Sequence, residues 1–258
     1  MRNKYTMILS IFAFLSIVVL CCLLCIYFIL TAFASSSDVV VRLGGGPYVL
    51  VVAHPDDECM FFAPTALSLR GRNLHVLCVS SGDFDGLGDV RKIEIMKSCQ
   101  CLGISRDHVT VMDDKQFPDD PNMLWDTNLL AEKIDIYLEK IRPKVIITFD
   151  RHGVSGHLNH ISLFNAIQML VKRNTGKSLI ALQLLTVNRL RKYIGVLDIC
   201  VSYLWRQQSD MVEVISSWQQ YWTAVQAMKQ HRSQFAWFRQ LYVVFSRYMA
   251  VNTLHRIS

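Results

Sequence analysis

The sequence predicts an α/β protein: a Rossmann-like, mainly parallel sheet with helices on both faces, preceded by one transmembrane helix. Three observations support this prediction. A long uncharged apolar stretch opens the chain, short apolar runs then alternate with stretches of helical periodicity, and polar clusters follow three of those runs. Such alternation is typical of βαβ units with right-handed crossovers. A length of 258 residues fits one anchor and one domain of roughly 200 residues.

The N-terminal stretch Met7–Leu30 carries no charge, and its only polar residues are Ser10 and Ser16. At ~1.5 Å per residue, a helix over it is roughly 35 Å long, enough for a hydrocarbon core of ~30 Å. A cleaved signal peptide is the alternative, because Ala32-Phe33-Ala34 resembles a cleavage site, but signal h-regions run only ~7–15 residues. The predicted organisation is therefore a segment 1–34 with a single transmembrane helix at about 7–30, a linker 35–46 and a domain 47–258.

Two signals disagree on which side of a membrane the domain lies. Arg2 and Lys4 precede the span, whereas only Arg42 closely follows it, and this bias favours a cytosolic N-terminus. Cysteine usage favours a cytosolic domain instead, because five cysteines, an odd number without a CxxC pair, are typical of free thiols. The absence of an N-x-S/T sequon agrees with the thiols, and we give the thiols more weight. The five are Cys59, Cys78, Cys99, Cys101 and Cys200.

Apolar runs predict the strands, which are expected at Tyr48–Ala53, His75–Ser80, Val109–Met112, Val145–Phe149 and near Leu179–Val187. Helical spacing predicts helices at Met60–Arg70, Val90–Leu102 and Leu129–Ile141. Gly103 and Pro143 are suitable stops for the second and third of these helices.

The C-terminal region is basic, since no Asp or Glu follows Glu213 and the net charge of the chain is +6. On a helix over Arg232–Met249, Arg232, Arg239 and Arg247 share one side, and aromatic and aliphatic residues cover the other. Such a basic amphipathic helix could lie on an anionic membrane. The alternative is a terminal helix packed on the sheet with a solvated arginine face.

Polar clusters follow three predicted strands: His54–Glu58, Ser81-Gly82-Asp83 and Asp150–His160. In open α/β sheets, ligands bind at the carboxyl ends of strands. Consecutive carboxylates repel each other, and a divalent metal would offset that repulsion while accepting both imidazole and carboxylate ligands. The two larger clusters together therefore predict one catalytic metal site.

Four side chains are candidate ligands: His54, Asp57, His157 and His160. A catalytic zinc usually keeps three protein ligands and one open position. One histidine is therefore free to act on the substrate. Asp56, beside Asp57 but separately oriented, is the natural general base.

Other common sites are not indicated. Gly44-Gly45-Gly46 precedes the first strand and is a linker, not a phosphate loop. Cys99 and Cys101 cannot face one site from a helix. The sequence has neither a Walker-type motif nor a G-x-S-x-G elbow, and basic charge alone does not indicate nucleic-acid binding.

The motifs Ala53-His54-Pro55-Asp56-Asp57-Glu58 and Gly156-His157-Leu158-Asn159-His160 resemble those of the LmbE-like zinc de-N-acetylases (the PIG-L family). The resemblance implies zinc, or another divalent metal, held by His54, Asp57 and His160. It implies Asp56 as general base and His157 as the residue that stabilises the oxyanion. Departures are modest: Cys59 follows the acidic triad where small residues are common, and Arg151-His152 varies.

More specific stretches, among them Phe117–Pro121 and Gly153–His157, resemble the branch of the family that acts on a lipid-linked sugar. The resemblance implies de-N-acetylation of N-acetylglucosaminyl-phosphatidylinositol, the second step of GPI-anchor synthesis. It also implies an enzyme anchored by a single span in the endoplasmic reticulum membrane, with its domain facing the cytosol. Arg91 is the candidate for binding the lipid phosphate. Two alternatives remain: a membrane-anchored deacetylase of a soluble N-acetylglucosaminide, and an inactive scaffold.

Overall fold

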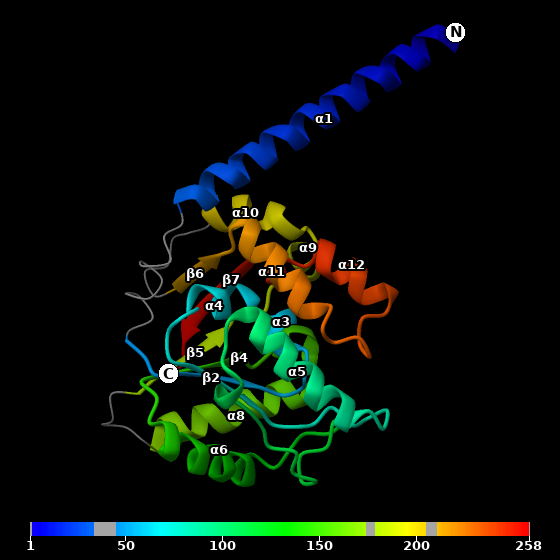
Figure 1. The fold of residues 1–258 in the computed structure, drawn as a ribbon. Coiled ribbons are helices and arrows are strands. Elements are labelled where there is room, and N and C mark those ends of the chain that lie inside the picture. Colours follow the sequence, from blue (N-terminus) through cyan, green and yellow to red (C-terminus); the bar gives the residue numbers. More distant parts are fainter. Residues whose placement is uncertain (1, 34–44, 174–178, 205–210, 258) are drawn as a thin grey trace.

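A computed structural model describes residues 2–33, 45–173, 179–204 and 211–257 (Figure 1). Helix α1 (Arg2–Phe33) extends away from an α/β domain that contains the remaining described residues. It meets that domain at α10 (Asp198–Leu204) and at the 3-10 turn η2 (Gly195–Leu197). The predicted linker 35–46 falls largely on residues 34–44, which lie outside the described residues.

Seven strands form one sheet in the order β3-β2-β1-β4-β5-β7-β6. The first five strands of the chain pair in parallel, whereas β7 is antiparallel to both β5 and β6. The sheet is therefore mainly parallel, as predicted. The strands are β1 (Tyr48–Val52), β2 (Leu74–Cys78), β3 (Val109–Val111), β4 (Val145–Phe149), β5 (Ile180–Leu184), β6 (Met211–Ile215) and β7 (Val251–Arg256).

The order of the strands in the sheet indicates where a ligand site lies. From β1 the chain crosses first to β2 and β3 on one side, and later returns to β4 and β5 on the other. Such a reversal opens a crevice at the carboxyl ends of the two central strands, where ligands bind in folds of this kind. Every residue of β1 and β4 is buried, so these two strand ends have rigid support.

Helices cover the sheet in two groups (Figure 1). The first group packs together as α3 (Asp57–Met60), α4 (Ala63–Ser68), α5 (Gly88–Leu102) and α11 (Trp218–Met228). The second group is the pair α6 (Thr127–Ile141) and α8 (Leu158–Arg173). The shorter elements are α7 (Gly153–Gly156), α9 (Arg189–Lys192), α12 (Trp237–Phe245), η1 (Arg106–His108) and η3 (Arg247–Met249).

Local sequence explains where several helices begin and end. The Asp126 side chain accepts a hydrogen bond from the Leu129 N–H and caps α6. Ser217 and Gln220 form a reciprocal capping box at the start of α11. Gly103 ends α5 with a φ of 84°, a left-handed conformation that glycine adopts without steric cost.

Among the helices in the described part of the chain, none is both long and apolar enough to cross a membrane. Helix α1 covers the stretch Met7–Leu30, so the helical part of the sequence prediction is confirmed, whereas its crossing of a membrane stays a prediction. The side chains at 23 and 26–33 are outside the described set, so part of the predicted span is not described.

The C-terminal helix is shorter than predicted, and its arginines do not share one solvated face. Helix α12 covers Trp237–Phe245 only, and Arg232 lies in a turn before it. Arg247 is fully buried, with its Nε 2.5 Å from Asp198 Oδ2. The chain then continues into β7, which pairs within the sheet. The C-terminal region therefore does not form one helix on the surface of the sheet.

Candidate functional site

The end of β1 forms a tight turn around one carboxylate. Asp57 Oδ2 accepts hydrogen bonds from the N–H groups of Ala53 and His54, at 3.0 and 2.9 Å. Asp56, between them and α3, has a φ of 132°. A non-glycine residue adopts such a conformation only when its surroundings enforce it, and such strain gathers at functional sites. The turn therefore points the side chains of Asp56 and Asp57 in different directions.

The end of β4 forms a second strained turn. The Asp150 carboxylate accepts hydrogen bonds from His152 N–H and from the N–H and hydroxyl of Thr186. Val154, a β-branched residue, follows with a φ of 62°. The turn leads directly into α8, whose first residues carry His160 into the crevice.

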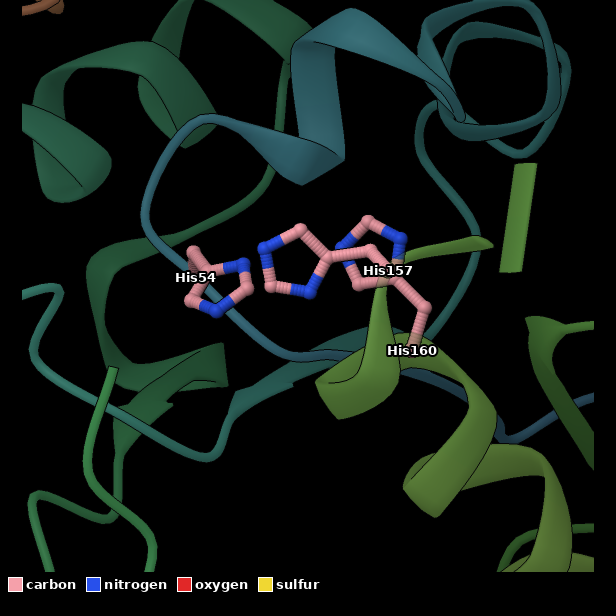
Figure 2. Close-up of side chains that lie close together, drawn as sticks. All are labelled: His54, His157 and His160. Atoms are coloured by element: carbon pink, nitrogen blue, oxygen red, sulfur yellow. The ribbon is translucent and has the colours of Figure 1, made fainter. Parts of the chain in front are cut away.

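The two turns bring the predicted ligands together. Potential ligand atoms of His54, His157 and His160 lie within 4.8 Å of one another, and Figure 2 shows the three rings side by side. Asp57 lies against two of them, with Oδ1 3.3 Å from His160 Nε2 and Oδ2 3.6 Å from His54 Nδ1. The geometry thus gathers all four candidate ligands, and it permits either a three-histidine set or one that includes Asp57.

This donor set fits a divalent metal. His157 Nδ1 is buried and lacks a hydrogen-bond partner in the described structure, although buried polar atoms are normally paired. His160 Nε2 is also buried, and its close polar neighbour is the Asp57 carboxylate at 3.3 Å. His160 Nδ1 lies 3.2 Å from the Gly153 carbonyl, which accepts its proton and leaves Nε2 with a free lone pair. Imidazole nitrogens that converge with a carboxylate oxygen are ligands that a zinc-type ion accepts.

Two residues that sequence reasoning did not assign orient His54. Its Nε2 lies 3.0 Å from Asn159 Oδ1 and 3.1 Å from Asp119 Oδ1. Both partners are acceptors, so the ring proton resides on Nε2, and Nδ1 is left for a ligand. Both residues lie within stretches that carry the family resemblance. Their position inside those stretches was the only sequence signal for them.

Burial separates the two neighbouring aspartates. Burial opposes ionisation of Asp57, but His160, His54 and backbone donors outweigh it and hold the pKa of Asp57 below its usual range. At Asp56, burial dominates and raises the pKa of the carboxyl above its usual range, against the opposing charges of Arg239 and Arg91. A carboxylate with a raised pKa is a better proton acceptor. The two side chains are thus prepared for different roles.

His157 is less buried than His54 and His160, and its ring lies 4.8 and 4.7 Å from theirs, centre to centre. Burial, followed by the neighbouring imidazoles of His160 and His54, lowers the pKa of His157 to about 4. Its ring is therefore neutral at neutral pH and can either donate an N–H or offer a lone pair.

The predicted phosphate ligand, Arg91, is enclosed by the site. Its guanidinium donates to the carbonyls of Pro55 and Gly82 at 2.8 and 2.9 Å, and it pairs with Asp119 at 3.2 Å. These contacts hold the β1 turn against the segment that follows β2. A phosphate-binding role for Arg91 remains a prediction.

Arg239, which sequence analysis placed on a solvated or membrane-facing side, reaches into the site. Its guanidinium lies 3.1 Å from Asp56 Oδ2. Arg239 belongs to the stretch Trp237-Phe238-Arg239, which also resembles the lipid-substrate branch of the family. That resemblance did not indicate an approach to Asp56, because α12 reaches the crevice only through the tertiary fold.

A second group of potential ligands, Glu58, Cys59 and His231, lies nearby. Three of its potential ligand atoms are already engaged within the protein: Glu58 Oε1 lies 2.7 Å from His231 Nε2 and accepts the Ser98 hydroxyl, and Cys59 Sγ donates to the Asp56 carbonyl. We therefore assign this group a structural role beneath the β1 turn.

The site opens into a cavity of about 600 Å³. Its polar wall contains the three histidines, three aspartates (Asp56, Asp57 and Asp119) and Lys192. Helix α12 supplies an apolar wall of Phe238, Leu241 and Phe245. A sugar-sized substrate with an apolar extension would fit these two walls.

Comparison with known proteins identifies relatives. Residues 49–171 match the family described as "PIG-L: GlcNAc-PI de-N-acetylase". The chain is 42% identical over 217 residues to N-acetylglucosaminyl-phosphatidylinositol de-N-acetylase of Bos taurus, covering 82% of this chain and 84% of that one. It is 35% identical over 238 residues to a probable N-acetylglucosaminyl-phosphatidylinositol de-N-acetylase of Dictyostelium discoideum, covering 81% and 92%.

Among solved structures, the fold resembles N,N'-diacetylchitobiose deacetylase from Pyrococcus horikoshii. The TM-score is 0.55 and the sequence identity 16%, with 76% of each chain covered. At this identity the likeness concerns the fold, and it supports the α/β architecture with a mainly parallel sheet.

Proposed function

The chain belongs to the GlcNAc-PI de-N-acetylase family, and from this we infer that it removes the acetyl group of N-acetylglucosaminyl-phosphatidylinositol during GPI-anchor synthesis. The observation that carries this inference is the meeting of His54, Asp57 and His160 at the β1 and β4 ends, with Asp56 beside them. The products are acetate and glucosaminyl-phosphatidylinositol.

The family is metal-dependent. For this chain we propose zinc, held by His54 Nδ1, Asp57 and His160 Nε2, because these atoms converge and the opposite ring nitrogens are engaged elsewhere. A divalent ion in that position would supply Lewis acidity, which polarises an amide carbonyl and makes water more acidic.

The chain's own side chains would perform the proton transfers. Asp56 takes a proton from the attacking water, and Arg239 and Arg91 hold its carboxylate in place. His157 directs a ring nitrogen at the acetyl oxygen and stabilises the charge that develops there. The proton held by Asp56 then passes to the departing amine, so that the sugar leaves as a free amine.

The Asp56→Asn variant tests this assignment. It keeps the size of the side chain but cannot accept the proton, so we expect turnover to fall by about 10²–10⁴-fold. Metal content, measured by atomic absorption, should match that of the unaltered protein. Asp120→Asn, a change of the same type in the Phe117–Pro121 stretch, should leave turnover intact. Normal turnover by Asp56→Asn would remove Asp56 from the mechanism.

A soluble N-acetylglucosaminide is the competing substrate, because nothing in the histidine cluster itself distinguishes it from a lipid-linked one. The apolar wall formed by Phe238, Leu241 and Phe245 favours the lipid-linked form. Purified protein should be assayed with both substrates. Equal kcat/KM for the two would favour the soluble one.

We also propose that the protein acts at the endoplasmic reticulum membrane with its domain in the cytosol. Support comes from α1, whose described apolar side chains are exposed, and from Cys59, Cys78 and Cys99, which are free thiols in the core. Protease treatment of sealed microsomes should digest a C-terminal tag if the domain faces the cytosol. Protection of that tag would place the domain in the lumen.

A further inference from the structure

Lys192, the last residue of α9, is a buried cation that the chemistry described above does not use. Its side chain is only 8% exposed and lines the same cavity as the histidine cluster. Its Nζ donates a hydrogen bond to the hydroxyl of Ser155, two residues before His157. The cation therefore lies on the polar wall of the cavity.

No carboxylate in the described part of the chain neutralises the charge of Lys192. Among the side chains that the structure describes, no carboxylate lies within ion-pair distance of its Nζ, whereas neighbouring Arg191 pairs with Asp198 at 2.7 Å. Burial, and next the charge of Arg239, lower the pKa of Lys192. A buried cation without an anion is costly, and a bound anionic group would remove that cost.

The segment that carries Lys192 joins the two walls of the cavity. On one side Lys192 contacts Ser155 in the turn that follows β4. On the other, Gly195 packs against the backbone of Val244 and Phe245 at the end of α12. Phe238, Leu241 and Phe245 line the cavity yet are each about half exposed, at 52, 50 and 50%. The apolar wall thus continues from the cavity onto the molecular surface.

We propose that Lys192 binds the phosphodiester of a lipid-linked sugar substrate, and that the lipid leaves the cavity along the exposed face of α12. The proposal rests on the proposed function, and it extends that function by naming a group that distinguishes phosphorylated from uncharged substrates. An ammonium group is a strongly hydrated point charge with three donors, which suits a phosphate oxygen in addition to the Ser155 hydroxyl.

The test compares full-length Lys192→Met, Lys192→Arg and the exposed control Lys140→Met. Each is assayed on three compounds: N-acetylglucosaminyl-phosphatidylinositol, its water-soluble glycerophosphodiester, and phosphate-free N-acetylglucosaminyl-inositol. Lys192→Met should raise KM about 10–100-fold for both phosphate-bearing compounds, the loss expected for one charged hydrogen bond. Its kcat, and its KM for the phosphate-free compound, should stay within about twofold. Lys192→Arg should recover most of the affinity, and Lys140→Met should behave as the unaltered protein.

A binding measurement separates this proposal from the proposed function. Calorimetry with inositol 1-phosphate, which involves no turnover, should show binding to the unaltered protein and about tenfold weaker binding to Lys192→Met. Inactivity of the unaltered protein on the lipid substrate would refute the proposed function. The calorimetric comparison would still show whether Lys192 binds a phosphate group. An equal rise in KM for the phosphate-free compound, or unchanged KM for all three, would overturn the role of Lys192.

Discussion

Asn159 is a single residue that joins the two halves of the site. Its side chain is fully buried, its Oδ1 faces His54 Nε2 at 3.0 Å, and its Nδ2 donates to the Met123 carbonyl at 2.9 Å. Asn159→Ala would hold the His54 ring less firmly, because its Nε2 would keep Asp119 but lose the amide oxygen. We expect metal affinity and kcat/KM to fall about 10–100-fold, the usual cost of losing such an outer partner.

Zinc titration with a competing chelator, together with steady-state kinetics, measures this effect. The exposed Asn122→Ala change is the matched control and should alter neither quantity. Unchanged zinc affinity in Asn159→Ala would show that Asp119 alone orients His54.

Glu58 is the carboxylate of the triad for which the sequence indicated no role at the metal. Its Oε1 pairs with His231 Nε2 at 2.7 Å, and both side chains are completely buried. His231→Phe would leave this buried carboxylate without its cationic partner, so we expect the free energy of unfolding to fall by about 3–5 kcal/mol. Urea denaturation measures the change.

The double variant Glu58→Gln/His231→Phe is the control for that measurement, because it removes the charge together with its partner. It should recover part of the stability lost by His231→Phe. If the single and double variants were equally destabilised, the loss would come from packing and not from an unpaired charge.

At the scale of elements, the segment between β2 and α5 supports the β1 turn through one close approach. Gly82 has a φ of 74°, and a Cβ there would lie 2.5 Å from Arg91 Cζ. Gly82→Ala should therefore both strain the backbone and displace the guanidinium that holds the Pro55 carbonyl. We expect a loss of stability of about 1–2 kcal/mol from the backbone alone, and a fall in kcat/KM because Asp56 loses support.

Gly86 provides a matched comparison, since its φ is 72° but an added Cβ would meet nothing within 4 Å. Gly86→Ala should show a similar loss of stability in urea denaturation and normal kinetics. Normal kinetics in Gly82→Ala as well would mean that Arg91 does not support the site.

The elements also show which parts of the fold could be predicted from sequence. The five parallel strands were predicted because continuous apolar runs identify strands buried on both faces. Strand β7 was missed because it carries Asn252 and Thr253 in the interior. Asn252 bonds to Thr65 and to the Phe61 carbonyl, partners that only the tertiary fold provides. The same applies to Arg247, whose burial depends on Asp198.

For the whole molecule, a site residue could be predicted from sequence when it lies in one of the two turns that follow β1 and β4. His54, Asp56 and Asp57 lie within one turn, and His157 and His160 within another, so local motifs revealed them. Topology then predicted that the two turns meet, because parallel strand ends share one edge of the sheet. The place of Lys192 and Arg239 at the site could not be predicted in this way, because both residues lie outside the two turns. Their approach to the crevice depends on how α9 and α12 pack against the turn after β4 and against the β1 turn.

We expect the domain to fold without its metal. The ligands are already held by protein groups: Asp57 by two backbone N–H groups, His160 by the Gly153 carbonyl and His54 by Asn159. The hydrophobic core is formed by the residues of the sheet and of the helices that cover it, none of which needs a metal. Exhaustive chelation should therefore abolish deacetylation while the far-UV circular dichroism spectrum stays unchanged. Adding zinc should restore activity and raise the free energy of unfolding, by about 2.7 kcal/mol at a free zinc concentration 100 times Kd. Activity that survived chelation would exclude a catalytic metal, and a spectrum that collapsed would show that the metal organises the fold.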